Sequence, residues 1–176
     1  MNMPVKISED TGLLHGMTVL EPSYFSDKRG QNFEGYNQEA YTKILGVVFN
    51  VDSFSISTRG VIRGFHGDSW SGKLIQVPIG FVRFVAIDLR SDSPTFKRVY
   101  ETELNVFNKK QVYIPAGIVN AHQCLSEQCL FSYKLTNGYA EPHQQIHLKY
   151  NEINWPIKES ILSDRDRNNG KKLCEF

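Results

Sequence analysis

Residues 73–89, with the sequence KLIQVPIGFVRFVAIDL, contain two runs of aliphatic, β-branched and aromatic residues on either side of a Pro-Ile-Gly segment. The runs, residues 73–77 and 81–89, have the composition of β-strands. Proline and glycine within residues 78–80 are typical of a turn. We therefore predict that this stretch forms two strands joined into a hairpin, and that β-structure dominates the fold.

Similar strand-like runs recur along most of the chain, and turn residues separate them. These runs are residues 17–20, 47–57, 98–104, 111–114 and 130–135, and the turns are residues 27–30, 91–94, 108–110 and 115–117. Short strands with turns between them predict an all-β sandwich or barrel. Residues 37–44 have a helical pattern, and the polar segment 163–172 is expected to lie over the surface of the body.

The composition agrees with this fold class. The chain has 176 residues, enough for one sizeable core, so we expect a single domain over residues 1–176. Eleven Phe, eight Tyr and two Trp stand against three Met, a bias toward residues that favour strands. The net charge of +1 argues against a protein that holds nucleic acid or a membrane surface by charge.

The cysteines and the N-terminus predict a reducing, cytoplasmic location. Cys124, Cys129 and Cys174 contain no Cys-x-x-Cys pair, and we expect all three to be free thiols. The first twelve residues lack the apolar stretch of a secretion signal, and nowhere do eighteen apolar residues run together.

The densest polar cluster is residues 59–68, RGVIRGFHGD, and Lys73 follows it closely. If this segment is extended, alternation places Arg63 on one face and His66, with Gly64, on the other. Gly64 leaves room beside His66 for a ligand or another backbone. An edge-strand histidine with solvated arginines is the alternative, but the nearby cationic and acidic residues make His66 a candidate site residue.

A second cluster is residues 115–122, PAGIVNAH. It resembles the Pro-x-Gly-x-x-His pattern of cupin jelly rolls, in which the histidine is a metal ligand. Asn120 occupies that place here, and a carboxamide is a poor ligand for transition metals. We therefore predict no metal site. His122 is either a site residue or a partly buried histidine with a backbone partner.

Two further features are ambiguous when each is taken alone. Strand alternation places Phe131, Tyr133 and Leu135 on one face, and a core tyrosine with a hydrogen-bonded hydroxyl is the stronger interpretation of Tyr133 by itself. Residues 162–166, LSDRD, read in isolation as a charged surface turn.

Taken in order, these clusters resemble the dTDP-4-dehydrorhamnose 3,5-epimerase family of cupin-like sugar epimerases. The motifs that carry the resemblance cover nearly the whole chain. They are residues 25–30, 33–34, 63–66, 72–74, 85–90, 93–96, 114–117, 133–134, 155–156 and 162–166. Ten motifs in the same order and spacing as in the family are a specific indication of the family, but they indicate the substrate much less specifically.

The resemblance implies a cupin-type jelly roll with short flanking helices. It implies an isomerase that inverts C3, and possibly C5, of a nucleotide-diphosphate-linked 4-keto-6-deoxy sugar without metal or cofactor. It also implies a homodimer with shared active sites, in which N-terminal strands exchange between subunits and Arg29 serves the partner's site.

By position in the family motifs, His66 resembles the base, Asp166 the carboxylate that orients it, Lys73 the cation beside the enolate oxygen, and Tyr133 the acid. These roles are chemically reasonable, because imidazole accepts protons near neutral pH and a carboxylate steadies the imidazolium. The remaining expected substrate contacts are Arg29, Glu34, Ser55, Ser57, Arg63, Asn120 and His122.

Three departures from the family pattern bear on the substrate. Gln31-Asn32 stands where rhamnose-pathway enzymes carry an aromatic pair, Asn120 replaces a histidine while His122 is new, and residues 66–68 read His-Gly-Asp. Together with residues 162–166, these features resemble the branch that handles GDP-linked 4-keto-6-deoxy heptoses for capsular polysaccharide.

We therefore expect a GDP-4-keto-6-deoxy-heptose epimerase, with the dTDP-hexose enzyme as the nearest alternative. A non-catalytic cupin that only binds a nucleotide sugar is a rival, but such a binder has no need of a base, an acid, a lysine and an orienting carboxylate. A metal-dependent cupin enzyme is disfavoured by Asn120.

Overall fold

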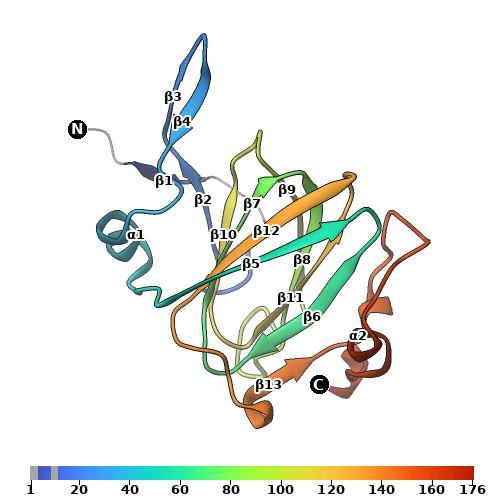
Figure 1. Cartoon of the computed structure of the whole chain (residues 1–176). Helices are drawn as coiled ribbons and strands as arrows, with labels where there is room; N and C mark the ends of the chain where they lie inside the picture. The colour runs from blue at the N-terminus through green and yellow to red at the C-terminus, as the bar shows by residue number, and fades with distance from the viewer. Residues whose placement is uncertain (1–3, 9–11) are drawn as a thin grey trace.

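Two antiparallel sheets face each other in the computed structural model, which describes residues 4–8 and 12–176 (Figure 1). Residues 1–3 and 9–11, part of the N-terminal segment without an apolar stretch, lie outside the described residues. In order across the six-stranded sheet, the strands are β1 (Val5–Ile7), β2 (Thr18–Pro22), β10 (Gln111–Ile114), β7 (Lys73–Ile79), β12 (Gln128–Leu135) and β5 (Val51–Thr58). In the five-stranded sheet they are β13 (Gln145–His147), β6 (Ile62–Asp68), β11 (Ile118–Cys124), β8 (Phe81–Asp88) and β9 (Val99–Asn105). The all-β prediction is confirmed.

The predicted hairpin at residues 78–80 is wrong, although both of its strands are present. β7 pairs with β10 and β12, whereas β8 pairs with β11 and β9 in the other sheet. Each strand is central in its own sheet, so strands distant in sequence satisfy both of its hydrogen-bonding edges. Gly80, with φ +83°, turns the chain from one sheet into the other.

The main core lies between the two sheets. It combines alternate residues of facing strands, among them Ile75, Phe84, Val112 and Phe131. A second apolar cluster covers the opposite face of the five-stranded sheet, where Phe65 packs with Trp155 of the C-terminal segment. Because both faces of this sheet are covered, its central strands are buried nearly throughout.

The C-terminal segment supplies that second cover through short helices. These are η1 (Pro142–Gln144), η2 (Tyr150–Glu152), α2 (Asp164–Asn168) and η3 (Leu173–Glu175). α2 begins at Ser163, whose hydroxyl accepts a hydrogen bond from the Asp166 backbone N–H at 3.1 Å. The polar segment 163–172 does lie against the body as expected, but Asp166 within it is buried.

The N-terminal part adds a hairpin and a helix to the body. β3 (Tyr24–Asp27) and β4 (Gly30–Phe33) pair with each other and project away from the two sheets (Figure 1). α1 (Gln38–Leu45) has Asn37 as its N-cap and ends at Gly46 in the left-handed conformation. The helix predicted at residues 37–44 is therefore present within one residue.

A β-bulge in β6 determines which of its side chains face the interior. His66 is opposite Asn120 and Arg63 is opposite His122, so Gly64 and Phe65 together face a single residue of β11. The extra residue places Arg63 and His66 on the same face, which corrects the prediction that they point to opposite faces. A Cβ on Gly64 would lie 2.5 Å from the Ala121 Cβ, so the room left by glycine is filled by the neighbouring strand.

The cysteines agree with the sequence prediction. Cys124 and Cys129 are buried and Cys174 is exposed, and all three are free. Among residues 4–8 and 12–176, no helix has both the length and the apolar character needed to cross a membrane.

Candidate active site

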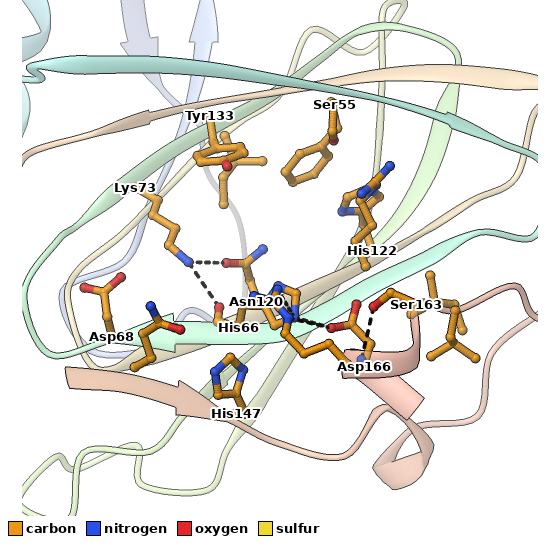
Figure 2. Close-up of a pocket in the computed structure, with 18 of the residues that line it drawn as sticks. Ser55, His66, Asp68, Lys73, Asn120, His122, Tyr133, His147, Ser163 and Asp166 are labelled. Atoms are coloured by element: carbon orange, nitrogen blue, oxygen red, sulfur yellow. Dashed lines mark hydrogen bonds and ion pairs between the residues drawn. The ribbon is translucent and has the colours of Figure 1, made fainter. Parts of the chain in front are cut away.

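A cavity of about 780 Å³ opens between the two sheets and is closed on one side by the C-terminal segment (Figure 2). Its size suits a small organic ligand. The cavity collects eight of the eleven predicted site residues, from β5, β6, β7, β11, β12 and α2. They are Ser55, Arg63, His66, Lys73, Asn120, His122, Tyr133 and Asp166.

His66 and Asp166 form a hydrogen-bonded pair in the cavity wall. The His66 Nε2 and Asp166 Oδ1 atoms are 2.7 Å apart, and the carboxylate is nearly buried while 30% of the imidazole is exposed. The Gly64 backbone N–H also donates to Asp166. Burial acts to raise the pKa of Asp166, but the hydrogen bond and charge of His66, the Gly64 backbone N–H and the charge of Arg165 together lower it below its usual value. The ionised carboxylate therefore fixes the orientation of the imidazole through this hydrogen bond.

Lys73 places an ammonium group beside this pair. Its Nζ donates to the His66 backbone carbonyl and to Asn120 Oδ1, both at 3.1 Å. Burial lowers the pKa of Lys73 to about 8, and the charge of Asp68 partly offsets this effect. Because both hydrogen-bond acceptors are neutral, the positive charge is available to an oxygen that develops negative charge in the cavity.

Tyr133 lies on the wall opposite His66. It belongs to β12 of the six-stranded sheet, whereas His66 belongs to β6 of the five-stranded sheet, and Figure 2 shows the two side chains on opposite sides of the cavity. Burial raises the pKa of Tyr133, and a hydrogen bond with Tyr139 adds to the effect. The phenol is therefore protonated at neutral pH and faces a ligand from the side away from His66.

Arg63 is held in place from the neighbouring strand β5. Its Nε donates to Ser57 Oγ at 2.9 Å and its Nη2 to the Ile56 carbonyl at 3.2 Å. Ser55 and Arg63 line the cavity. Ser57, also predicted as a substrate contact, is buried and does not line it, and its hydroxyl holds the Arg63 guanidinium in place instead. A guanidinium fixed in this way can still donate to an anionic ligand.

His122 is almost fully buried and stacks on Phe131, with ring centroids 3.8 Å apart and planes 8° apart. Burial lowers the pKa of His122 to about 3, and the charges of Arg63 and His66 add to this effect. Of the two interpretations that the sequence allowed, the structure favours the pocket residue, since His122 lines the cavity and its Nε2 has no hydrogen-bond partner among the described residues.

The cavity residues that sequence reasoning did not name as site residues include Tyr139, His147 and Arg165. His147 is opposite His66 in the β13–β6 ladder, and the two rings meet edge to face at 5.4 Å. Arg165 Nη2 lies 3.1 Å from His66 Nε2. Arg165 belongs to a motif that the sequence showed, but β13 is too short to give His147 a recognisable pattern.

Arg29 and Glu34 are not brought into the cavity of this chain. Arg29 lies at the tip of the projecting hairpin, largely exposed, and its guanidinium pairs with Asp27. Glu34 accepts a hydrogen bond from the Asn37 side chain at 3.2 Å. Both residues therefore lie away from the predicted site within one subunit.

The cavity holds nitrogen and oxygen donors but no cluster suited to a metal. Within the described ranges, no group of three or more His, Cys, Asp or Glu residues is arranged to hold a metal ion.

A sequence model of the family "dTDP-4-dehydrorhamnose 3,5-epimerase" matches residues 12–173. The chain belongs to the dTDP-4-dehydrorhamnose 3,5-epimerase family. A family member from Pseudomonas aeruginosa is 40% identical over 166 residues, which cover 89% of this chain and 91% of the relative. Membership makes the protein a sugar-nucleotide epimerase, an isomerase.

Solved structures of dTDP-4-dehydrorhamnose 3,5-epimerase family members have the same architecture. The enzyme from Sulfolobus tokodaii superposes with a TM-score of 0.87 at 34% identity, covering 98% of this chain and 97% of that one. The Legionella pneumophila enzyme, solved with dTDP-4-keto-L-rhamnose, gives a TM-score of 0.83 at 34% identity, covering 92% and 89%. The cupin-type jelly roll is thus confirmed, whereas these names give no support to a GDP-linked heptose.

Proposed function

We propose that the protein epimerises a nucleotide-diphosphate-linked 4-keto-6-deoxy sugar by removing and returning a proton through an enolate. The observation that carries this proposal is the placement of the His66–Asp166 pair and Tyr133 on opposite walls of one cavity, with the Lys73 ammonium beside His66. Inversion of a carbon requires a base on one face of the sugar and an acid on the other.

In this mechanism the C4 ketone makes the hydrogens on C3 and C5 acidic. His66 takes one of these protons, the C–H electron pair moves into the ring, and the ketone oxygen becomes an enolate oxygen. Lys73 stabilises that oxygen, since its charge is held in a site with little water. Tyr133 then donates its proton to the opposite face. His66 releases the proton it took to solvent and Tyr133 takes one up, which restores both groups.

The first candidate substrate is dTDP-4-dehydrorhamnose or its 4-keto precursor, because the relatives in the comparisons are named for dTDP sugars. A GDP-linked 4-keto-6-deoxy-heptose, for capsular polysaccharide, is the second candidate. It is favoured by polar Gln31 and Asn32 on the exposed β4 strand and by Asn120 and His122 in the cavity.

The proposed assembly is a homodimer with shared active sites. Arg29 lies on a hairpin that makes no strand pairing with either sheet in the described part of the chain, and Tyr24 and Phe25 on it are exposed. We expect this hairpin to pack on a second copy and to bring Arg29 to the partner's cavity. A monomer in light scattering at micromolar concentration would contradict the assembly.

The proposal is tested by incubating the protein in heavy water with dTDP- and GDP-linked 4-keto-6-deoxy sugars. NMR then shows which carbon takes up deuterium and whether its configuration inverts. Uptake at C3 alone indicates a 3-epimerase, and uptake at C3 and C5 a 3,5-epimerase. Binding of the sugars without any uptake would identify the protein as a non-catalytic binder and refute the proposal.

A further inference from the structure

His122 presents an unmet polar atom at the cavity wall. Its side chain is 2% exposed, and the Nε2 atom has no hydrogen-bond partner among residues 4–8 and 12–176. Buried polar atoms in folded proteins are nearly always hydrogen-bonded, because an unmet atom has given up water without replacement. Since His122 lines the cavity, a ligand group is the natural partner for this nitrogen.

Packing alone does not explain an imidazole at this position. The ring lies flat on Phe131, and a phenyl ring would make the same stack without burying a polar edge. The nitrogen adds a desolvation cost and contributes nothing to that contact. Its presence therefore indicates a polar interaction that forms in the bound state.

The imidazole of His122 is itself uncharged. The low pKa of His122, caused by burial and by the neighbouring charges of Arg63 and His66, keeps the imidazole neutral. A neutral imidazole has one N–H donor and one acceptor nitrogen. Such an imidazole suits a hydroxyl group, which can both donate and accept a hydrogen bond. Because it is not protonated, His122 is a poor alternative to Tyr133 as the acid.

The strand register indicates which part of the sugar is near. His122 is two residues from Asn120 on the same face of β11, a distance of about 7 Å along the strand. Asn120 accepts from Lys73, which the proposed mechanism places at the C4 oxygen. Figure 2 shows Lys73 and His122 at opposite ends of the cavity.

In a pyranose ring the carbon across from C4 is C1, which carries the diphosphate. Arg63, opposite His122 in the ladder, has the charge for that diphosphate. C1 is flanked by the ring oxygen and by C2, and of the two polar groups there only the C2 hydroxyl can both donate and accept a hydrogen bond. This hydroxyl takes no part in the reaction.

We infer that His122 is a specificity-determining residue whose imidazole hydrogen-bonds the C2 hydroxyl of the bound sugar. The inference rests on the proposed function for the orientation of the sugar. It predicts that the enzyme discriminates against 2-deoxy sugars by direct recognition of this hydroxyl.

The test measures binding by calorimetry and requires no turnover. The probes are dTDP, dTDP-glucose and dTDP-2-deoxyglucose, and the corresponding GDP compounds. Wild type should bind the 2-hydroxy sugar about tenfold more tightly than the 2-deoxy sugar. His122→Phe, which keeps the stack on Phe131, should bind the 2-hydroxy sugar about tenfold more weakly while its affinity for the 2-deoxy sugar and the bare nucleotide is unchanged.

His122→Gln, which restores a polar group, should recover part of the discrimination. Equal affinity of wild type for the two sugars overturns the inference, even if neither variant folds. An equal loss by His122→Phe for both sugars and the bare nucleotide also overturns it, since that pattern is structural. Absence of deuterium uptake would refute the proposed function, whereas the binding comparison can still be made because it requires no turnover.

Discussion

His66 and Asp166 share a 2.7 Å hydrogen bond although 100 residues separate them in the chain. β6 carries the histidine, and the short helix α2 carries the carboxylate against the edge of the cavity. The bond joins a strand of the barrel to the C-terminal segment that covers it. It therefore couples the docking of that segment to the state of the proposed base.

Asp166→Asn keeps the size of the side chain and removes its charge. We expect the rate of epimerisation to fall by about a hundred- to ten-thousand-fold, because the amide neither stabilises the imidazolium nor fixes its orientation. Substrate affinity should change little. A loss confined to KM, measured by steady-state kinetics, would contradict the orienting role.

The same carboxylate contributes to stability in a pH-dependent way. Its pKa is lower in the folded state than the value of about 3.9 in an unfolded chain. The stabilisation is therefore fully present above pH 4 and is lost as pH falls through the folded-state pKa. Urea unfolding of wild type and Asp166→Asn should show a stability difference that shrinks below pH 4.

Tyr133→Phe and His66→Asn should separate the two halves of the reaction. His66→Asn should abolish both deuterium uptake and inversion, because no enolate forms. Tyr133→Phe should retain some uptake, as His66 can return a proton to the face it left, while inversion falls by about a hundred- to ten-thousand-fold. If Tyr133→Phe inverts substrate at nearly the wild-type rate, Tyr133 is a packing residue.

The rate of epimerisation should be limited at high pH by the deprotonation of Lys73, whose pKa is about 8. The rate should fall as pH rises through this value, because the neutral amine no longer stabilises the enolate.

Burial of the Lys73 charge should also affect stability. In the unfolded chain the lysine stays protonated up to about pH 10.4, so holding the charge in the buried site lowers the free energy of unfolding at neutral pH. Lys73→Met should therefore be inactive, yet about 1–3 kcal/mol more stable toward urea at pH 7; a less stable variant would count against this account.

Gly64 should tolerate no side chain. Its φ is +128°, and an added Cβ would lie 2.5 to 2.7 Å from atoms of Asn120 and Ala121. Gly64→Ala should lower the free energy of unfolding by about 2–4 kcal/mol and misplace His66. Gly138→Ala is the matched control, because nothing lies within 4 Å of its added Cβ. Equal stability of the two variants would show that the bulge does not require glycine at position 64.

The sequence predicted strands well where composition alone decides them. β7, β8, β10 and β12 were placed within a few residues, since each has a dense run of strand-forming side chains. The pairing of these strands was not predicted correctly. The partners of β7 and β8 are distant in sequence, so nothing within residues 73–89 distinguishes a hairpin from a crossing between sheets.

The site was predictable to the extent that the family motifs cover it. Asp166 could not have been singled out from its own surroundings, because Leu-Ser-Asp-Arg-Asp is an ordinary polar turn until α2 docks beside His66. The shared face of Arg63 and His66 depends on one extra residue in β6, which strict alternation cannot anticipate. His147 was missed because its position depends entirely on the pairing of β13 with β6.

The bond between His66 and Asp166 also bears on the timing of synthesis. Ribosomes add about 5–20 residues per second, so a nascent chain holds His66 for about 5–20 s before Asp166 exists. Both sheets are already encoded by residue 147, so a barrel can assemble during translation without an oriented base. In the proposed mechanism, His66 is therefore not oriented by a carboxylate until Asp166 has been made and α2 has docked.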